Sequence, residues 1–121
     1  MTGKQVPGKL EPDIVAVRHT KDGVALELRI TPDIAPLAGH FPDLPIVPGV
    51  ALVDWVTRFA ARHVGFRDDG AIRLQIKFRR VLRPECDVTL ILHEISDRRV
   101  RFEYRHSDTV YALGAISSGD T

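Results

Sequence analysis

The most restrictive feature of the chain is a run of prolines in its first half. Five of them fall within residues 31–48: Pro32, Pro36, Pro42, Pro45 and Pro48. Proline lacks a backbone N–H group and fixes φ, so it interrupts helices and is excluded from central strands. We therefore predict a stiff loop over residues 31–48, and any long helix has to begin after it.

One long helix is predicted directly after this loop. The segment VALVDWVTRFAARHV follows Gly49 and ends before Gly65, a residue type that commonly closes helices. Its apolar residues cover nearly the whole helical circumference, and Arg62 and His63 lie in its second half, where cations suit the helix dipole. This pattern predicts a helix that is enclosed on most sides. A single carboxylate, Asp54, interrupts its apolar first half.

The remaining segments alternate apolar and polar residues, as half-buried strands do. IVAVRHT and VALELRI flank the turn Lys21-Asp22-Gly23, which predicts a hairpin. AIRLQIKFRRVL, DVTLILHEI, VRFEYRH and VYALGAIS follow the helix and predict three or four further strands. Two strands, one helix and then more strands indicate an α+β domain, in which an antiparallel β-sheet wraps around one buried central helix.

Length and charge narrow the classes of partner. The chain has 121 residues, of which 44% are hydrophobic, with 17 Lys+Arg against 16 Asp+Glu. This suits one domain over residues 1–121 and does not favour nucleic acid as a partner. Residues 1–12 are expected to form a loose arm, and residues 117–121 to fray. A core of this size also favours oligomerisation.

The cellular location is predicted from what the sequence lacks. Cys86 is the sole cysteine, so no intrachain disulfide can form, which suits a reducing compartment. The first residues lack an apolar signal core, and no apolar run has the length of a membrane span. A cytoplasmic protein without membrane contact is expected.

His40, Gly49 and Asp54 offer the three functions that acid–base chemistry beside a carbonyl requires. The imidazole of His40 has an ordinary pKa of about 6.5, which suits a general base. The unpaired N–H groups of a helix that starts at Gly49 can polarise a carbonyl oxygen. Asp54 in an apolar helix is expected to be desolvated, which would raise the pKa of its carboxyl group and make it a proton donor.

This set of residues suits the removal of an α-proton and the loss of a β-hydroxyl group. Each member also has a structural alternative. A loop histidine is more often structural than catalytic, a carboxylate in a helix can pair with an arginine, and proline-rich loops mostly connect other elements.

The segment HFPDLPIVPGVALVD, residues 40–54, resembles a known signature. It is that of the hot-dog-fold 3-hydroxyacyl-ACP (acyl carrier protein) dehydratases of the FabA/FabZ type, H-F-P-x-x-P-[IV]-x-P-G-x-x-x-x-[ED]. IKFRRVLRPECDVTL is similar to a strand of that family that reads K-F-R-x-x-[VIL]-x-P-G-D. The order of predicted elements is also that of the hot-dog fold, over roughly residues 14–117. The resemblance implies a (3R)-hydroxyacyl thioester substrate and a trans-2-enoyl product, in fatty acid or aryl-polyene-type biosynthesis.

The resemblance implies a role for each matching residue. His40 would be the base at the substrate α-carbon, Asp54 the acid that protonates the departing hydroxyl, and the Gly49 amide the donor to the thioester carbonyl. In this family the histidine and the acid of one site come from different subunits, which implies a homodimer with composite active sites. The residues expected to line the substrate tunnel are Phe41, Pro48, Val50, Val53 and Trp55. No cofactor and no metal is implied.

The sequence departs from the family pattern at three places. Asp43 stands where the family commonly has glycine, the acid is aspartate rather than the glutamate of FabZ-like members, and PECD replaces P-G-D. The Asp54-Trp55 pair in PGVALVDWV is similar to the short, ApeI-like dehydratases of aryl-polyene pathways.

An acyl carrier protein is acidic, so basic side chains near the tunnel would help it to dock. The candidates for carrier-protein or phosphopantetheine docking are Lys77, Arg79, Arg80 and Arg83. The alternative is that these residues form only the solvated side of a strand.

Two rival functions stay open. One is an acyl thioesterase of the same fold, which would use an acid on the same helix to activate water. The other is a non-catalytic partner subunit of another dehydratase. The H-F-P…P-G signature favours dehydration over the first rival, and the presence of both His40 and Asp54 argues against the second.

Overall fold

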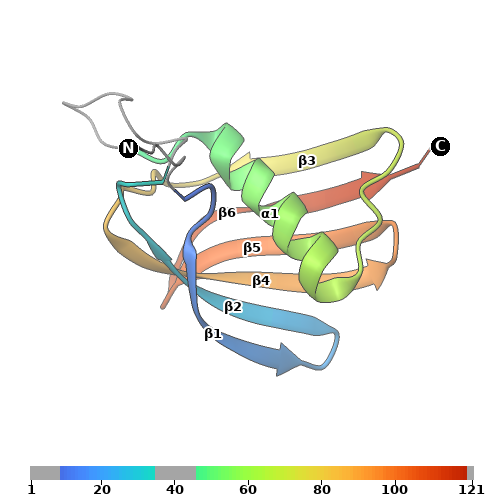
Figure 1. The fold of residues 1–121 in the computed structure, drawn as a ribbon, viewed down its shortest axis with the longest axis horizontal. Helices are drawn as coiled ribbons and strands as arrows, with labels where there is room; N and C mark the ends of the chain where they lie inside the picture. Colours follow the sequence, from blue (N-terminus) through green and yellow to red (C-terminus); the bar gives the residue numbers. More distant parts are fainter. Residues whose placement is uncertain (1–8, 35–45, 120–121) are drawn as a thin grey trace, which may run out of the picture.

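A computed structural model describes residues 9–34 and 46–119 of the protein, and Figure 1 shows the fold. One helix, α1 (Gly49–Val64), crosses one face of a six-stranded antiparallel sheet. In sheet order the strands are β1 (Asp13–Thr20), β2 (Gly23–Ile30), β4 (Cys86–Ser96), β5 (Arg99–His106), β6 (Thr109–Ser118) and β3 (Ile72–Phe78). The predicted α+β class, the hairpin and the long helix are confirmed. No helix in the described part of the chain has the length and apolar character needed to cross a bilayer.

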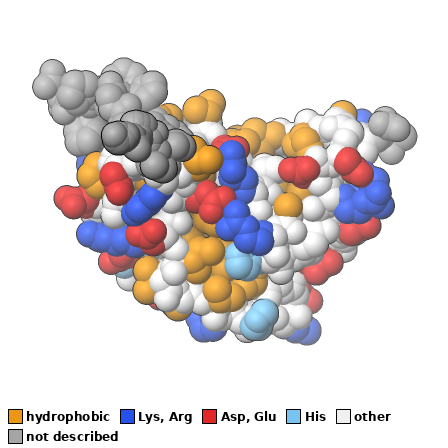
Figure 2. All heavy atoms as spheres, viewed as in Figure 1, with side chains coloured by type: hydrophobic (Ala, Val, Ile, Leu, Met, Phe, Trp, Pro, Cys, Tyr) orange, Lys and Arg blue, Asp and Glu red, His pale blue; other side chains and the backbone are white. Residues whose placement is uncertain are grey.

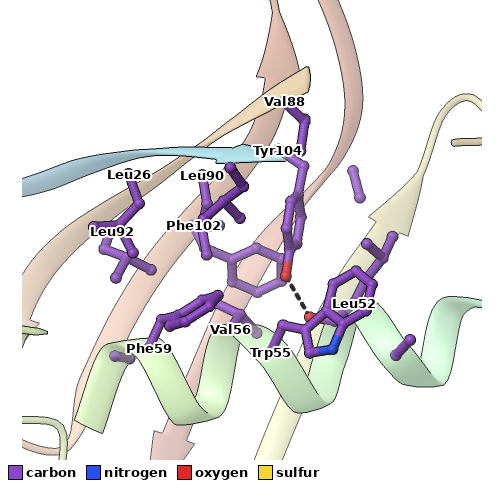
Figure 3. Close-up of a cluster of buried hydrophobic side chains, with 14 of the residues drawn as sticks. Leu26, Leu52, Trp55, Val56, Phe59, Val88, Leu90, Leu92, Phe102 and Tyr104 are labelled. Atoms are coloured by element: carbon purple, nitrogen blue, oxygen red, sulfur yellow. Dashed lines mark hydrogen bonds between the residues drawn. The ribbon is translucent and has the colours of Figure 1, made fainter. Parts of the chain in front are cut away.

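The core lies between α1 and the inner face of the sheet. Trp55, Val56 and Phe59 of α1 are fully buried, because their spacing places them in one stripe along the helix. Each large apolar side chain that is removed from water stabilises the fold by about 1.5–3 kcal/mol. Figure 3 shows the centre of this cluster, where α1 packs on residues of β2, β4 and β5: Leu26, Val88, Leu90, Leu92, Phe102 and Tyr104.

The two ends of α1 differ in how their backbone groups are satisfied. At the carboxyl end Gly65 has a φ of 71°, in the left-handed region, and its N–H donates to the Ala60 carbonyl. At the amino end Pro48 precedes Gly49, no described side chain caps the first amides, and the first turn holds no acidic residue. Among the described residues, therefore, no cap or acidic side chain in the first turn offsets the positive end of the helix dipole at Gly49.

The prediction that α1 is enclosed on most sides is wrong for the single chain. Val50 is 78% exposed, and Leu74 and Phe78 of β3 are 40% and 53% exposed. The cause is geometric: α1 meets the edge strand β3 only at the helix start, beside Phe78, and then crosses toward the middle of the sheet (Figure 1). Figure 2 shows apolar side chains along this margin of the molecule, beside a band of charged side chains over α1.

Near both chain ends the structure holds residues that the sequence predicted to be loose. Leu10, within the predicted loose arm of residues 1–12, accepts a hydrogen bond from the indole N–H of Trp55 at 3.1 Å. Ser118 is a buried member of β6, so the fraying predicted for residues 117–121 does not hold there.

His63, near the end of α1, gives the fold a pH dependence. Burial, and then the nearby Arg62, hold the pKa of the His63 imidazole below its ordinary value. The unfolded chain therefore binds more protons below about pH 6.5, and folding stability should fall as the pH falls through that range. We expect His63→Gln to flatten this dependence. Urea unfolding at pH 7.5 and 5.5 measures the free energy of unfolding of the wild type and the variant. If both proteins lose the same amount of stability at pH 5.5, His63 is not the cause of the pH dependence.

Candidate active site

Gly49 begins α1 directly against the ring of Phe78 from β3. A Cβ atom at residue 49 would lie 2.7 Å from the nearest ring carbon, well inside the contact distance of two carbon atoms. The packing of β3 on the helix start thus favours glycine here. Glycine also places no side chain over the first amides of α1, and Gly49 lines the two grooves described next.

Two shallow grooves meet at Gly49, and both have mostly apolar walls. The first has a volume of about 460 Å³ and is lined by Gly49, Val50, Val53, Leu74, Ile76 and Phe78. The second, of about 340 Å³, runs along the loop side of the helix start, between Ile46–Leu52 and residues 78–82. Among the predicted tunnel residues, Val50 and Val53 line the first groove and Pro48 lines the second. An acyl chain fits the chemistry of these walls.

Trp55 does not line either groove. It is fully buried in the core beneath α1, so its predicted place in the tunnel is wrong for the single chain. The burial of Trp55 nevertheless determines the direction in which Asp54 points. Successive helical residues point about 100° apart, so a Trp55 that faces the sheet turns Asp54 away from the sheet.

Asp54 is more exposed than the sequence predicted. Its side chain is 48% exposed and accepts a hydrogen bond from the Arg58 Nε atom at 2.9 Å. Arg58 also lies 4.0 Å from Glu11, which binds Arg62 through two hydrogen bonds of 2.6 and 3.1 Å. The expectation of a desolvated carboxyl group is therefore wrong for the single chain. Desolvation of Asp54 would require a second surface over this side of α1.

Tyr104 of β5 fixes the helical turn that carries Asp54. Its buried hydroxyl donates a hydrogen bond to the Leu52 carbonyl at 2.6 Å (Figure 3). Burial, and to a smaller extent the Asp54 carboxylate, raise the pKa of the Tyr104 phenol well above its ordinary range. The hydroxyl therefore stays protonated and holds residues 52–56 at a fixed height above the sheet.

The predicted base, His40, and the predicted tunnel residue Phe41 lie outside the described residues. So does Asp43, where the sequence departs from the dehydratase pattern. Their parts in the site remain predictions from the signature.

The structure separates the four predicted docking cations. Arg79 and Arg80 border the 340 Å³ groove beside Gly49, and both of their amides donate to the Tyr111 carbonyl. Lys77 alternates with the groove residues Ile76 and Phe78, so it points to the opposite face of the sheet. Arg83 is exposed and borders neither groove. Of the four predicted docking residues, Arg79 and Arg80 are thus the two that lie near the helix start.

Two residues of the site were not singled out from the sequence. Arg58 stands four residues after Asp54, a spacing that commonly pairs side chains on a helix. Phe78 ends the alternating segment of β3 and covers Gly49. The first could have been found from its spacing, whereas the second depends on how β3 packs against the helix.

The part of the chain that the structure describes contains neither a metal site nor an activated thiol. The described ranges contain no group of three His, Cys, Asp or Glu residues arranged to hold a metal ion. Burial and the adjacent Asp87 raise the pKa of the Cys86 thiol, so it stays protonated and is a poor nucleophile.

Comparison with known proteins identifies the family. The family model described as ApeI-like, ApeI dehydratase, matches residues 16–115. The chain belongs to the ApeI-like dehydratase family. A curated relative, the 3-hydroxyacyl-[acyl-carrier-protein] dehydratase FabZ of Methylobacterium radiotolerans, is 30% identical over 87% of this chain and 75% of its own length. The FabZ of Rickettsia africae is 30% identical over 66% of this chain, which spans 59% of that relative's length.

Solved structures of similar proteins identify the fold of this chain as the hot-dog fold. The dehydratase heterocomplex ApeI:P from Xenorhabdus doucetiae matches with a TM-score of 0.74 and 25% identity, over 88% of this chain and 96% of that one. An uncharacterised protein from Erwinia carotovora matches with a TM-score of 0.63 and 29% identity, over 93% and 95% of the two chains. The dehydratase domain of PpsC from Mycobacterium tuberculosis, at 18% identity and a TM-score of 0.71 over 93% and 45%, supports the fold alone.

Proposed function

We propose that this ApeI-like protein is a dehydratase that removes water from a (3R)-3-hydroxyacyl thioester and forms the trans-2-enoyl thioester. The observation that carries the proposal is one helix whose amide end, at Gly49, lines an apolar groove and whose exposed carboxyl group, at Asp54, directly follows the groove residue Val53. The FabZ relatives, whose names specify acyl-ACP dehydration, support the same reaction class.

The proposed reaction uses three groups. The neutral imidazole of His40 takes the proton from the α-carbon, and the electron pair of that C–H bond forms the α–β double bond. The bond between the β-carbon and its hydroxyl oxygen breaks, and the Asp54 carboxyl gives this oxygen a proton, so water leaves. The Gly49 amide donates to the thioester oxygen as negative charge develops there. A proton then passes from His40 to Asp54 through solvent, which restores both groups.

We propose that a second hot-dog subunit completes this site. An acid role for Asp54 requires desolvation, which the single chain does not supply. The exposed Val50 of α1 and the exposed apolar side chains of β3 form a continuous face beside Asp54. β3 is also the edge strand of the sheet, with β6 as its described neighbour. A subunit that pairs with β3 would cover this face and bring its own His40-type residue or acid to the site.

The thioester carrier is proposed to be an acyl carrier protein. Arg79 and Arg80 lie beside the groove that leads to Gly49, where they can meet a phosphopantetheine phosphate or acidic side chains of the carrier. Hydrolysis of the thioester would need an activated water molecule, which the elimination does not.

Substitution of Gly49 tests the role of the helix start. We expect Gly49→Ala to slow dehydration about tenfold or more, because the new methyl group and the Phe78 ring have to separate and the first amides shift with them. The half-exposed ring can rotate, so the thermal midpoint should change little. The double variant Gly49→Ala, Phe78→Leu should regain part of the rate, and Phe78→Leu alone serves as the matched control. A Gly49→Ala enzyme with full activity would contradict the assignment.

The test of the proposed function is a mass-spectrometric assay of (3R)-3-hydroxyacyl-ACP substrates of several chain lengths. Dehydration removes 18 Da from the loaded carrier, and we expect this change with the wild type and its loss with His40→Ala. Release of the free thiol instead would favour the rival thioesterase. Failure on every chain length, alone and with a co-purified partner, would leave the non-catalytic subunit as the function.

A further inference from the structure

Arg58 of α1 lies between two carboxylates and is hydrogen-bonded to one of them. Its Nε atom donates to Asp54 at 2.9 Å, while its Nη1 atom lies 4.0 Å from Oε2 of Glu11. Asp54, Arg58 and Arg62 follow one another at intervals of four residues, so they share one side of the helix. Glu11 comes from the segment before β1 and meets this side of α1, where Figure 2 shows a band of charged side chains. The side chains thus form a row of alternating charge, in the order Asp54, Arg58, Glu11 and Arg62.

Two contacts fix Glu11 at its place in this row. Its carboxylate accepts hydrogen bonds of 2.6 and 3.1 Å from Arg62, and its side chain is 21% exposed. The preceding residue, Leu10, accepts the hydrogen bond of the buried Trp55 indole at 3.1 Å. Glu11 is therefore a fixed and partly buried acceptor, whereas the Arg58 side chain beside it is 43% exposed.

The proposed proton donor cannot stay in its ion pair with Arg58. A guanidinium binds the ionised form of a carboxyl group, so this pair opens when Asp54 takes up a proton. Arg58 keeps its charge at any physiological pH and would then lack a counter-charge. Under the second surface that the proposed site requires, an unpaired guanidinium is strongly unfavourable. A second carboxylate within reach removes this difficulty, and Glu11 has the position to supply it.

The Arg58 guanidinium can reach Glu11 by a small movement. A shift of about 1 Å would bring the Nη1 atom into hydrogen-bond range of Oε2 of Glu11. This oxygen can accept a second hydrogen bond beside that from Arg62, because each carboxylate oxygen has two lone pairs. The Tyr104 phenol of β5, beneath this turn of α1, stays protonated and offers no counter-charge.

We propose that Arg58 is a positioning residue shared by Asp54 and Glu11: it holds the ionised Asp54, and it moves to Glu11 when Asp54 takes up a proton. The proposal rests on the proposed function, because it describes how Asp54 becomes the proton donor. Only hydrogen bonds are exchanged, and the proton enters through solvent. In this exchange Glu11 acts on Asp54 through Arg58, the residue that contacts both carboxylates.

An NMR titration of the Asp54 carboxyl carbon, assigned with Asp54→Asn, tests the exchange without turnover. We expect Arg58→Gln to raise the pH at which Asp54 takes up its proton by about half a pH unit, because the ionised form loses its partner. Glu11→Gln should lower it by about 0.3 pH unit, because Arg58 is then left to Asp54 alone. The double variant should behave as Arg58→Gln alone. Glu27→Gln removes an exposed carboxylate on β2 and is the matched control, which should leave the titration unchanged.

The pH dependence of dehydration gives a second measurement. The protonated Asp54 is the active form, so the rate falls as the pH rises past the point at which this proton is lost. We expect this decline to move to higher pH in Arg58→Gln and to lower pH in Glu11→Gln. A merely structural contact between Glu11 and the helix would move neither decline.

The outcomes separate this proposal from the proposed function. An effect of Glu11→Gln that is equal with and without Arg58 would overturn the exchange, because Glu11 would then act by tethering its segment or directly through space. A titration of Asp54 that neither variant moves would overturn it as well. An inactive wild type that shows the expected titrations would overturn the proposed dehydration and leave the exchange of Arg58 supported.

Discussion

Asp54→Asn is expected to slow dehydration by about 10²–10⁴-fold while leaving the fold almost unchanged. The amide cannot give a proton to the departing hydroxyl group, so the elimination loses its general acid. The cost in stability should be small, because Asp54 is half exposed and its ion pair with Arg58 joins residues four apart on one helix. Pairs of this kind contribute about 0.3–0.5 kcal/mol. The mass-spectrometric assay gives the rate, and thermal unfolding followed by circular dichroism gives the stability.

The matched control for this substitution is Asp69→Asn. Asp69 is also an exposed carboxylate that binds an arginine, Arg98, at 2.9 Å. It lies beyond the carboxyl end of α1, however, whereas Asp54 directly follows the groove residue Val53. Its loss should leave the rate of dehydration unchanged. If Asp54→Asn keeps more than about a tenth of the wild-type rate, Asp54 is not the proton donor. The exposed carboxylate would then be a surface residue whose ion pair with Arg58 is its whole role.

The sequence predicted the order of the elements well, for a physical reason. Alternation over two residues and the 3.6-residue helical period depend on local geometry, so they indicate β2, β3 and α1 without knowledge of the neighbours. Gly65 marks the end of α1 for the same reason, since its left-handed backbone is a local requirement. The H-F-P…P-G signature likewise identified the family that the comparisons show.

The surroundings of Asp54 could not be predicted in this way. Periodicity shows which side chains are apolar, and not which surface covers them. Trp55 and Val50 are both apolar residues of α1, yet the first packs on the chain's own sheet and the second is 78% exposed. The sequence pattern therefore predicted burial for both faces of the helix, although only the face toward the sheet is buried. Only the placement of α1 over the middle of the sheet separates them and leaves Asp54 beside an open apolar face.

Trp55→Ala is expected to lower the free energy of unfolding by about 3–5 kcal/mol. Trp55 is fully buried between α1 and the sheet, and its indole N–H donates to the Leu10 carbonyl at 3.1 Å. Alanine would leave a cavity at the centre of the cluster and remove the hydrogen bond that ties Leu10 to the helix. A domain of ordinary stability has about 5–15 kcal/mol in total, so the variant should be close to unfolding at physiological temperature.

Trp55→Phe separates the two contributions to this loss. Phenylalanine keeps most of the aromatic packing and removes the indole donor, so it should cost about 1 kcal/mol for the hydrogen bond and a smaller packing defect. Urea unfolding followed by far-ultraviolet circular dichroism measures both variants, since Trp55 is the sole tryptophan and its fluorescence is lost with it. Protein concentration has to be equal, because any association of subunits stabilises the folded state by mass action. A Trp55→Ala variant within about 1 kcal/mol of the wild type would mean that α1 does not rest on the sheet through this residue. Asp54 would then lose the anchor that turns it toward the open face.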